Sequence, residues 1–172
     1  MTEAVNEAVA QETQQHLGKY ITFALDGEEY GIPILNVREI IGMMKITPVP
    51  GTPRFVRGVI NLRGKVIPVI DLRTRFGLEF KDSDDRTPII VVEVYHNDSK
   101  LQIGIVVDAV SEVIQVTAGD MEETPSFGVN VDTDFILGMA KIDDGIKTLL
   151  DIDRVVTSED LVLLEATKKS AS

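Results

Sequence analysis

The sequence has no cysteine and no tryptophan, and only two of its 172 residues are histidine. The lack of cysteine excludes disulfides, thiolate metal ligands and cysteine nucleophiles, and two histidines leave little imidazole chemistry. Basic residues are also outnumbered, because 17 Lys and Arg stand against 28 Asp and Glu, a formal net charge of -11. Duplex binding needs a basic face, so we predict no nucleic-acid partner unless this charge is strongly segregated.

Long apolar runs are missing as well. The longest, such as residues 89–92, span only a few residues, whereas a membrane-spanning helix needs about 20. Residues 1–18 contain neither Lys nor Arg and no apolar core of a secretory signal. We therefore predict a cytoplasmic protein of one ordinary domain or two small ones, with no direct insertion into a membrane.

The sequence is instead rich in β-branched residues, with 21 valines and 18 isoleucines against nine aromatics. They fall in short runs separated by turn-forming pairs, a pattern typical of strands joined by hairpins. The runs predict strands at residues 20–25, 29–32, 56–62, 66–72, 89–95, 101–107, 112–116, 137–142 and 146–150. The predicted turns between them are Asp26-Gly27, Gly64-Lys65, Asn97-Asp98 and Asp144-Gly145.

Helix signals are fewer. Pro33 is predicted to open a short turn, and residues 72–76 are predicted to form a short helix. Residues 158–166 are predicted to form a C-terminal helix, capped by Thr157 or Ser158. Tails at residues 1–17 and 167–172 are predicted to be disordered, and the acid-rich segment 81–86 is predicted to link two halves of the chain.

The two halves resemble each other. Two segments align without gaps, residues 31–41 on 104–114 and residues 58–72 on 138–152. Asp71 and Asp151 occupy equivalent positions after strands, so we predict capping or turn-forming roles for both. A repeat of this kind predicts two small β units, and curling each unit into a barrel removes exposed sheet edges.

The expected fold is therefore mostly β, with two pseudo-repeated five-stranded SH3-like or OB-like barrel subdomains, short helices and a C-terminal helix. The domain is predicted at residues 18–166. Its first subdomain is expected at about residues 19–80 and its second at about residues 88–157. An exchange of strands between the subdomains is compatible with this division.

The charge is unevenly distributed. Between residues 54 and 75 lie six basic residues and one acid, Asp71, a local charge of +5 that leaves -16 elsewhere. The basic patch predicted here comprises Arg54, Arg57, Arg63, Lys65, Arg73 and Arg75. It is interpreted either as a surface for an acidic protein partner or as a solvated edge that prevents aggregation. An OB-type nucleic-acid binder is disfavoured, because Phe55 is the only aromatic in the stretch.

No catalytic or metal-binding pattern is found. Residues 58–65 lack the spacing and the Ser or Thr of a phosphate-binding loop. Residues 130–134 begin like a calcium loop, but Phe135 replaces its glycine. His16 and His96 lie far apart in the sequence, so they offer no obvious pair of ligands. We predict no enzymatic activity, cofactor, metal or small-molecule substrate.

Several of these segments together resemble the CheW family of bacterial chemotaxis coupling proteins. They are residues 29–34, 37–40, 58–64, 68–73, 104–108 and 149–153, among which Asn61-Leu62-Arg63-Gly64 is quite specific. The resemblance spans roughly residues 18–166. It also extends to the regulatory domain of the kinase CheA and the coupling domain of CheV. The length favours a free-standing adaptor, and a regulatory domain cut from a larger kinase is the alternative.

The resemblance implies a non-enzymatic adaptor of two barrel subdomains, recruited to membrane-associated receptor arrays. It would bind the regulatory domain of CheA and the cytoplasmic tip of transmembrane chemoreceptors. The receptor tip, a helical hairpin, would dock in an apolar groove between the subdomains. The receptor-contact candidates at matching positions are Val37, Glu39, Gly58, Arg63, Val110 and Val113, with turn-forming roles for Asn61 and Gly64.

Several candidates also have a structural interpretation. Val37 and Val110 are repeat equivalents, so either is also compatible with the core. A glycine inside a strand, such as Gly58, often satisfies a backbone requirement. Arg63 either contacts a partner or braces the seam between the subdomains by pairing with Glu39 or Glu112.

Overall fold

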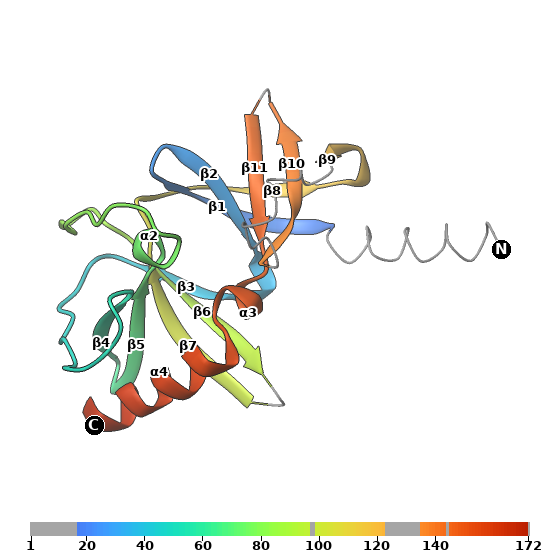
Figure 1. Cartoon of the computed structure of the whole chain (residues 1–172). Coiled ribbons are helices and arrows are strands. Elements are labelled where there is room, and N and C mark those ends of the chain that lie inside the picture. Colours follow the sequence, from blue (N-terminus) through green and yellow to red (C-terminus); the bar gives the residue numbers. More distant parts are fainter. Residues whose placement is uncertain (1–16, 97–98, 123–134, 144, 172) are drawn as a thin grey trace.

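The structure is a computed structural model that describes residues 17–96, 99–122, 135–143 and 145–171. Two β-sheets make up most of it, one in the upper and one in the lower half of Figure 1. The prediction of a mostly β fold with a few short helices is confirmed.

The first sheet has six strands in the order β8-β1-β2-β11-β10-β9. These are β1 (Gly18–Leu25), β2 (Glu28–Pro33), β8 (Ala109–Val116), β9 (Met121–Glu122), β10 (Ile136–Ile142) and β11 (Gly145–Leu150). The second sheet has five strands in the order β3-β6-β7-β5-β4. These are β3 (Val37–Ile41), β4 (Val56–Leu62), β5 (Lys65–Asp71), β6 (Ile89–His96) and β7 (Ser99–Val106).

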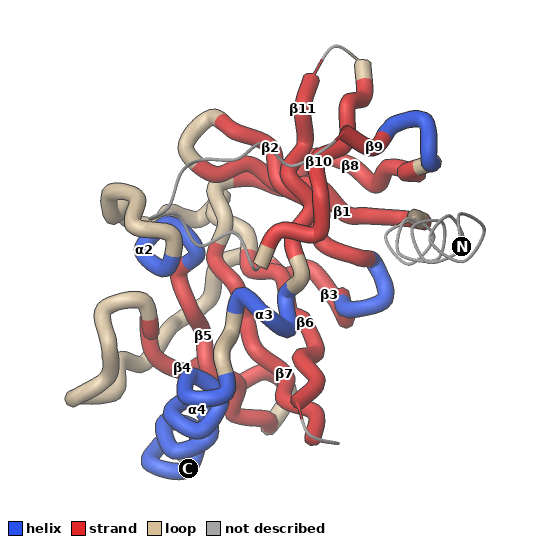
Figure 2. Tube along the Cα trace, turned by 45° about the vertical axis from the view of Figure 1, so that its right-hand side comes forward, coloured by secondary structure: helices blue, strands red, loops and turns tan. Residues whose placement is uncertain are grey.

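Short helices connect the strands. They are η1 (Ile34–Asn36), α2 (Leu72–Arg75), η2 (Ala118–Asp120), α3 (Ile152–Val155) and the longer α4 (Ser158–Ala171). Figure 2 shows where α4 and α3 lie, and both contact the five-stranded sheet, α4 on β4 and β5 and α3 on β6.

All nine predicted strands are present, and β3 and β9 are additional. One sheet has the five strands expected of a barrel and the other has six. Among the described residues, strand pairing closes neither sheet, which differs from the closed barrels that were expected. At the β4 edge, one isolated bridge between Thr47 and Val59 covers the strand, so the chain leaving β3 reaches the opposite edge of its sheet.

Neither sheet is built from one repeat alone. β1 and β2 of the first repeat lie beside β8, β10 and β11 of the second, whereas β3, β4 and β5 lie with β6 and β7. The two parallel pairings correspond residue by residue, because Val69 faces Gly104 in one sheet and its repeat equivalent Leu149 faces Gly31 in the other. The repeats have therefore exchanged strands symmetrically.

One predicted turn is found where it was expected, and at two others the next strand begins one residue earlier than predicted. Asp26 and Gly27 form a turn with positive φ at both positions, as predicted. The next tip is formed by Arg63 and Gly64, however, and Lys65 already belongs to β5. Gly145 likewise opens β11 rather than forming the turn. The predicted turn Asn97-Asp98 lies outside the described residues.

Asp71 and Asp151 have the same structural role in the two repeats. Each carboxylate accepts a hydrogen bond from the backbone N–H two residues on and so caps the short helix α2 or α3. The backbone N–H of Asp71 donates to Phe55 O, and that of Asp151 donates to Phe135 O, both at 2.8 Å. Phe55 and Phe135 are themselves equivalent positions of the two repeats. The local structure thus repeats as the sequence does.

The C-terminal helix is longer than predicted. Thr157 caps it, since Thr157 Oγ1 accepts from Asp160 N at 3.2 Å and Thr157 N donates to the Asp160 carboxylate at 3.0 Å. The helix continues to Ala171, into the segment where a disordered tail was expected. Buried Thr167 anchors this extension, and its hydroxyl donates to Leu163 O at 2.9 Å.

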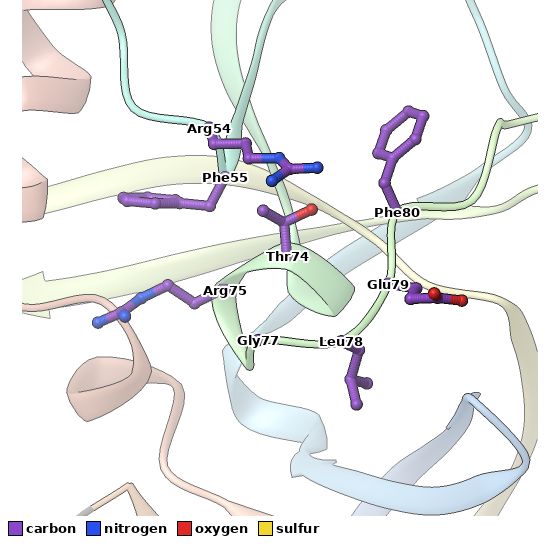
Figure 3. Close-up of a pocket in the computed structure, with 8 residues that line it drawn as sticks. All are labelled: Arg54, Phe55, Thr74, Arg75, Gly77, Leu78, Glu79 and Phe80. Atoms are coloured by element: carbon purple, nitrogen blue, oxygen red, sulfur yellow. The ribbon is translucent and has the colours of Figure 1, made fainter.

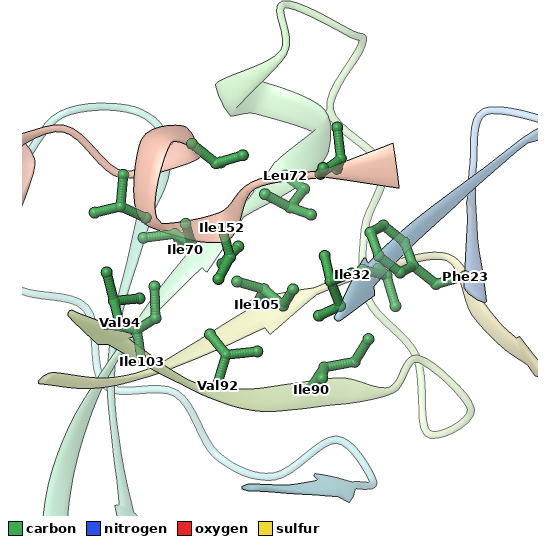
Figure 4. Packing of buried hydrophobic residues seen from close by; sticks show 14 of the residues in the cluster. Phe23, Ile32, Ile70, Leu72, Ile90, Val92, Val94, Ile103, Ile105 and Ile152 are labelled. Carbon is green, nitrogen blue, oxygen red and sulfur yellow. The ribbon is translucent and has the colours of Figure 1, made fainter. Parts of the chain in front are cut away.

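The largest apolar cluster is shared by the two sheets (Figure 4). It joins Phe23 and Ile32 of the six-stranded sheet to Ile90 and Ile105 of the five-stranded sheet, and α3 adds Ile152. Each sheet also has a smaller cluster of its own. Because burial of one such side chain contributes roughly 1.5–3 kcal/mol, the shared cluster holds the two sheets together as one unit.

Candidate functional site

The hairpin between β4 and β5 carries the most specific motif residues at its tip. Arg63 and Gly64 have φ values of 51° and 86°, a backbone conformation that is unusual for arginine. Asn61 stabilises it, because its Oδ1 accepts a hydrogen bond from Gly64 N–H at 2.9 Å. The turn leaves the Arg63 side chain exposed at the end of the sheet.

Arg63 forms an ion pair with Glu39 of β3. Since β3 and the β4–β5 hairpin lie at opposite edges of the five-stranded sheet, the pair links these edges. The hydrogen bond to Glu39 raises the pKa of the Arg63 guanidinium, so the arginine stays charged. Of the two predicted partners, Glu39 is the one used, and the bond lies within one sheet rather than across the seam between sheets.

Gly58 is buried where two backbones meet. Its φ is 139°, and a Cβ atom there would lie 2.1 Å from the carbonyl oxygen of Thr47. That carbonyl accepts the Val59 N–H at 2.9 Å in the bridge that covers the β4 edge. A side chain at position 58 would therefore disrupt the bridge.

The three candidate valines differ in exposure. Val37 on β3 and Val110 on β8 are half-buried against the shared core. Val113 on β8 is an exposed large apolar residue. The first two therefore contribute to packing between the sheets, and the third is available to a partner.

Sequence reasoning missed an exposed apolar group beside these candidates, made up of Ile34, Leu35 and Ile40. Leu35 is 90% exposed, and Ile34 and Ile40 are also exposed. Ile34 and Leu35 belong to η1, which contacts both β1 and β6 and so lies at the seam between the sheets. Apolar residues in a sequence equally suit a buried strand or the core, so the exposure of these three side chains is visible only in the structure.

The predicted basic patch does not form one surface. Lys65 and Arg73 lie at opposite ends of β5, because Arg73 follows that strand in α2. The arginines also have carboxylate partners, Asp71 for Arg57 at 3.4 Å and Asp160 for Arg75 at 3.3 Å. Asp71 is already counted in the local charge of +5, and the acids that lower this excess from other parts of the chain are Glu39, Asp108 and Asp160, paired with Arg63, Arg73 and Arg75.

Arg54 differs from these, since no carboxylate lies within ion-pair distance of it among the residues that the structure describes. It lines a cleft of about 760 Å³ together with Phe55, Thr74 and Arg75 (Figure 3). The Arg75 guanidinium carbon lies 5.3 Å from the centroid of the Phe55 ring, and Arg75 Nε donates to Val155 O. These two contacts fix one wall of the cleft. Arg54 is the member of the patch that this cleft leaves available.

Arg73 instead joins the two sheets. Its side chain is 11% exposed and contacts Asp108 at 2.6 Å and Asp26 at 3.4 Å. Asp26 belongs to the hairpin turn of the six-stranded sheet, and its N–H donates to the same Asp108 carboxylate at 2.8 Å. The arginine therefore links α2 to the opposite sheet.

In the described ranges, no group of three His, Asp or Glu residues is placed to hold a metal ion. No helix among the described residues is long and apolar enough to cross a membrane. His16 and the calcium-like segment at 130–134 lie outside the described residues.

Comparison with known proteins identifies the family. Residues 19–160 match the family model of the CheW-like domain. The chain belongs to the CheW family. The relatives include the chemotaxis protein CheW of Klebsiella aerogenes, 36% identical over 99% of this chain and 96% of the relative, and that of Bacillus subtilis, 37% identical over 82% and 88%.

A solved structure has the same fold. The scaffolding protein TtCheW of Thermoanaerobacter tengcongensis is similar with a TM-score of 0.71 and 37% identity, covering 84% of this chain and 95% of that one. The family resemblance predicted from the sequence is confirmed. A CheW-family protein is a chemotaxis scaffold that works by binding proteins and catalyses no reaction.

Proposed function

We propose that this protein couples transmembrane chemoreceptors to the histidine kinase CheA in membrane-associated receptor arrays. The observation that carries the proposal is the match of residues 19–160 to the CheW-like domain. The shared core supports it physically, because a scaffold that holds two partners in fixed relation needs its two sheets to move as one.

The receptor surface is proposed on Val37, Glu39, Gly58, Arg63, Val110 and Val113, extending from the seam between the sheets to the β4–β5 hairpin tip. Exposed Leu35 and Ile40 extend this set with apolar side chains that a helical hairpin tip can cover. Gly58 would act indirectly, by shaping the backbone at the β4 edge. The Arg63–Glu39 pair would present two charges at the rim, where they favour orientation more than affinity.

The kinase surface is proposed on an outer surface of the sheets, where the regulatory domain of CheA, a relative of this fold, can pack. Arg54 in the cleft of Figure 3 is available there to an acidic side chain. Arg57, Arg73 and Arg75 are proposed to shape this region through their internal ion pairs rather than to contact the kinase.

Co-sedimentation with receptor-containing membranes tests the proposal. CheA is expected to sediment in quantity only when this protein is added, and absence of a ternary complex contradicts the proposal. Leu35→Asp is expected to weaken receptor binding by at least about tenfold, since loss of a central apolar anchor costs about 2 kcal/mol. Val162→Asp is the matched control, because Val162 is a 72% exposed aliphatic residue on α4, away from the seam.

A further inference from the structure

Three lysines from distant parts of the chain meet at one end of the five-stranded sheet. Lys65 begins β5, Lys100 lies near the start of β7, and Lys168 lies near the end of α4. Because β5 and β7 are parallel neighbours, both strands start at the same end of the sheet. The helix α4 ends beside the start of β5, at the bottom of Figure 1. The three side chains line one cleft of about 520 Å³, called the lysine cleft below.

The lysine cleft is positively charged. Within the described part of the chain, none of the three ammonium groups has a carboxylate within ion-pair distance. Among the described residues that line the cleft, the one acid is Glu93, whose side chain is 8% exposed and paired with Arg38 at 2.9 Å. Three cations thus converge in a chain whose net charge is -11.

Ordinary structural roles explain single lysines but not their grouping. The Lys100 ammonium lies 5.6 Å from the centroid of the Tyr95 ring, a cation–π contact that involves Lys100 alone. Protection of a sheet edge does not apply to Lys65 and Lys100, since β5 and β7 are interior strands of the sheet. The helix dipole favours a cation near the end of α4 and so explains Lys168 alone. Like charges brought together repel each other, which a binding partner of opposite charge would relieve.

We propose that the lysine cleft binds an acidic segment of a partner protein, with carboxylates placed among the three ammonium groups. Lysine heads are mobile point charges, so they accept carboxylates in many geometries and favour fast, salt-sensitive association. A flat anionic membrane suits the site less well, because the lysines line a concave cleft and most of the other charge is negative. The proposal adds a contact surface to the proposed receptor and kinase surfaces and depends on neither.

A fluorescent twelve-residue peptide with six Glu separated by Gly and Ser is the probe, and the same peptide with Gln is its control. The intact protein is expected to bind the Glu peptide at low salt and to lose most of this binding at about 0.15 M salt. NMR titration should shift the amides of Gly64, Leu101 and Gln102, which line the cleft.

Charge reversal then locates the site. K65E/K100E/K168E is expected to weaken binding at least about tenfold, because it removes three attractive contacts and places three carboxylates against an acidic peptide. K19E/K45E/K81E changes the net charge equally, from -11 to -17, at exposed lysines outside the cleft, and should change affinity less than about threefold.

The proposal is overturned by equal weakening in the two triple variants, by equal binding of the Glu and Gln peptides, or by NMR shifts outside the cleft. Tighter binding to phosphatidylglycerol vesicles than to the peptide would assign the cleft to a membrane surface instead. The NMR map uses the unmodified protein, so the proposal stays testable even if the triple variant unfolds.

Discussion

Gly58 and Gly138 occupy equivalent repeat positions with different surroundings. Both follow a register shift in a hairpin, at Val56/Gly58 and Ile136/Gly138. A Cβ on Gly58 would meet backbone atoms of Thr47, whereas one on Gly138 would meet only the flexible end of Met121, at 2.6 Å. The same residue type is therefore fixed by backbone contact in one repeat and is less constrained in the other.

Gly58→Ala is accordingly predicted to destabilise the protein by about 3 kcal/mol, through backbone strain and overlap with Thr47. Gly138→Ala should cost distinctly less, since Met121 can move, and Gly42→Ala should be nearly neutral, since nothing lies within 4 Å of its added Cβ. Urea unfolding of the three variants measures these differences. Equal losses at positions 58 and 138 would show that the Thr47 contact is unimportant.

Asp153 carries a charge that the fold disfavours. Burial raises the pKa of its carboxyl, nearby Asp151 raises it further, and the hydrogen bond from Tyr95 N–H at 2.9 Å opposes the shift. A carboxyl with a raised folded-state pKa contributes stability that is fully present below its unfolded pKa of about 3.9. That contribution is lost as the pH rises through the folded pKa.

Asp153→Asn should therefore be more stable relative to the parent at pH 7 than at pH 3, since Asn keeps an acceptor for Tyr95 and removes the charge. Asp120→Asn should show the opposite trend, because hydrogen bonds from Thr117 lower the pKa of Asp120. Urea unfolding at the two pH values measures both. A pH-independent difference for Asp153→Asn would contradict the assigned cause.

Among the elements, the strands were the best predicted. Alternating and continuous β-branched runs located nine of the eleven strands that the structure describes, and Asp26-Gly27 located one hairpin. β3 was missed because its apolar residues do not follow one buried face, and Ile40 is exposed. The extension of α4 depends on burial of Thr167, a tertiary contact that local pattern does not reveal.

The Arg63–Glu39 pair joins two elements at opposite edges of one sheet, so its role can be tested by exchanging the charges. Arg63→Glu alone places two carboxylates together and should weaken receptor binding while unfolding stays cooperative. Glu39→Arg/Arg63→Glu restores the pair in reverse. If bracing is the whole role, the double variant regains binding, and if Arg63 touches a partner it does not, as a double-mutant cycle in co-sedimentation measures.

At the scale of the whole molecule, the exchange of strands between repeats explains why the repeat could be predicted from the sequence and the strand order could not. The repeat itself was visible, and Asp71 and Asp151 behave alike, as predicted. Strand partners are set by tertiary contacts, however, and the same strands suit either arrangement. The basic patch failed as one surface for a related reason, because its arginines pair with acids distant in sequence such as Asp108 and Asp160.

Arg73 stabilises the relation between the two sheets. Arg73→Met is predicted to cost about 3 kcal/mol, because it leaves the largely buried carboxylate of Asp108 beside Asp26 without a cation. Arg86→Met, at an exposed arginine of the loop before β6, should change stability by less than about 0.5 kcal/mol. Urea unfolding compares the two, and similar small losses would show that the sheets do not depend on this link.

The proposed function is that this CheW-family protein places CheA under the control of chemoreceptors. Its most direct test is the autophosphorylation rate of CheA with receptor-containing membranes, measured with and without this protein and with and without receptor ligand. The ligand is expected to change the rate only when this protein is present. A ligand response of equal size in its absence, or no response in its presence, would contradict the claim.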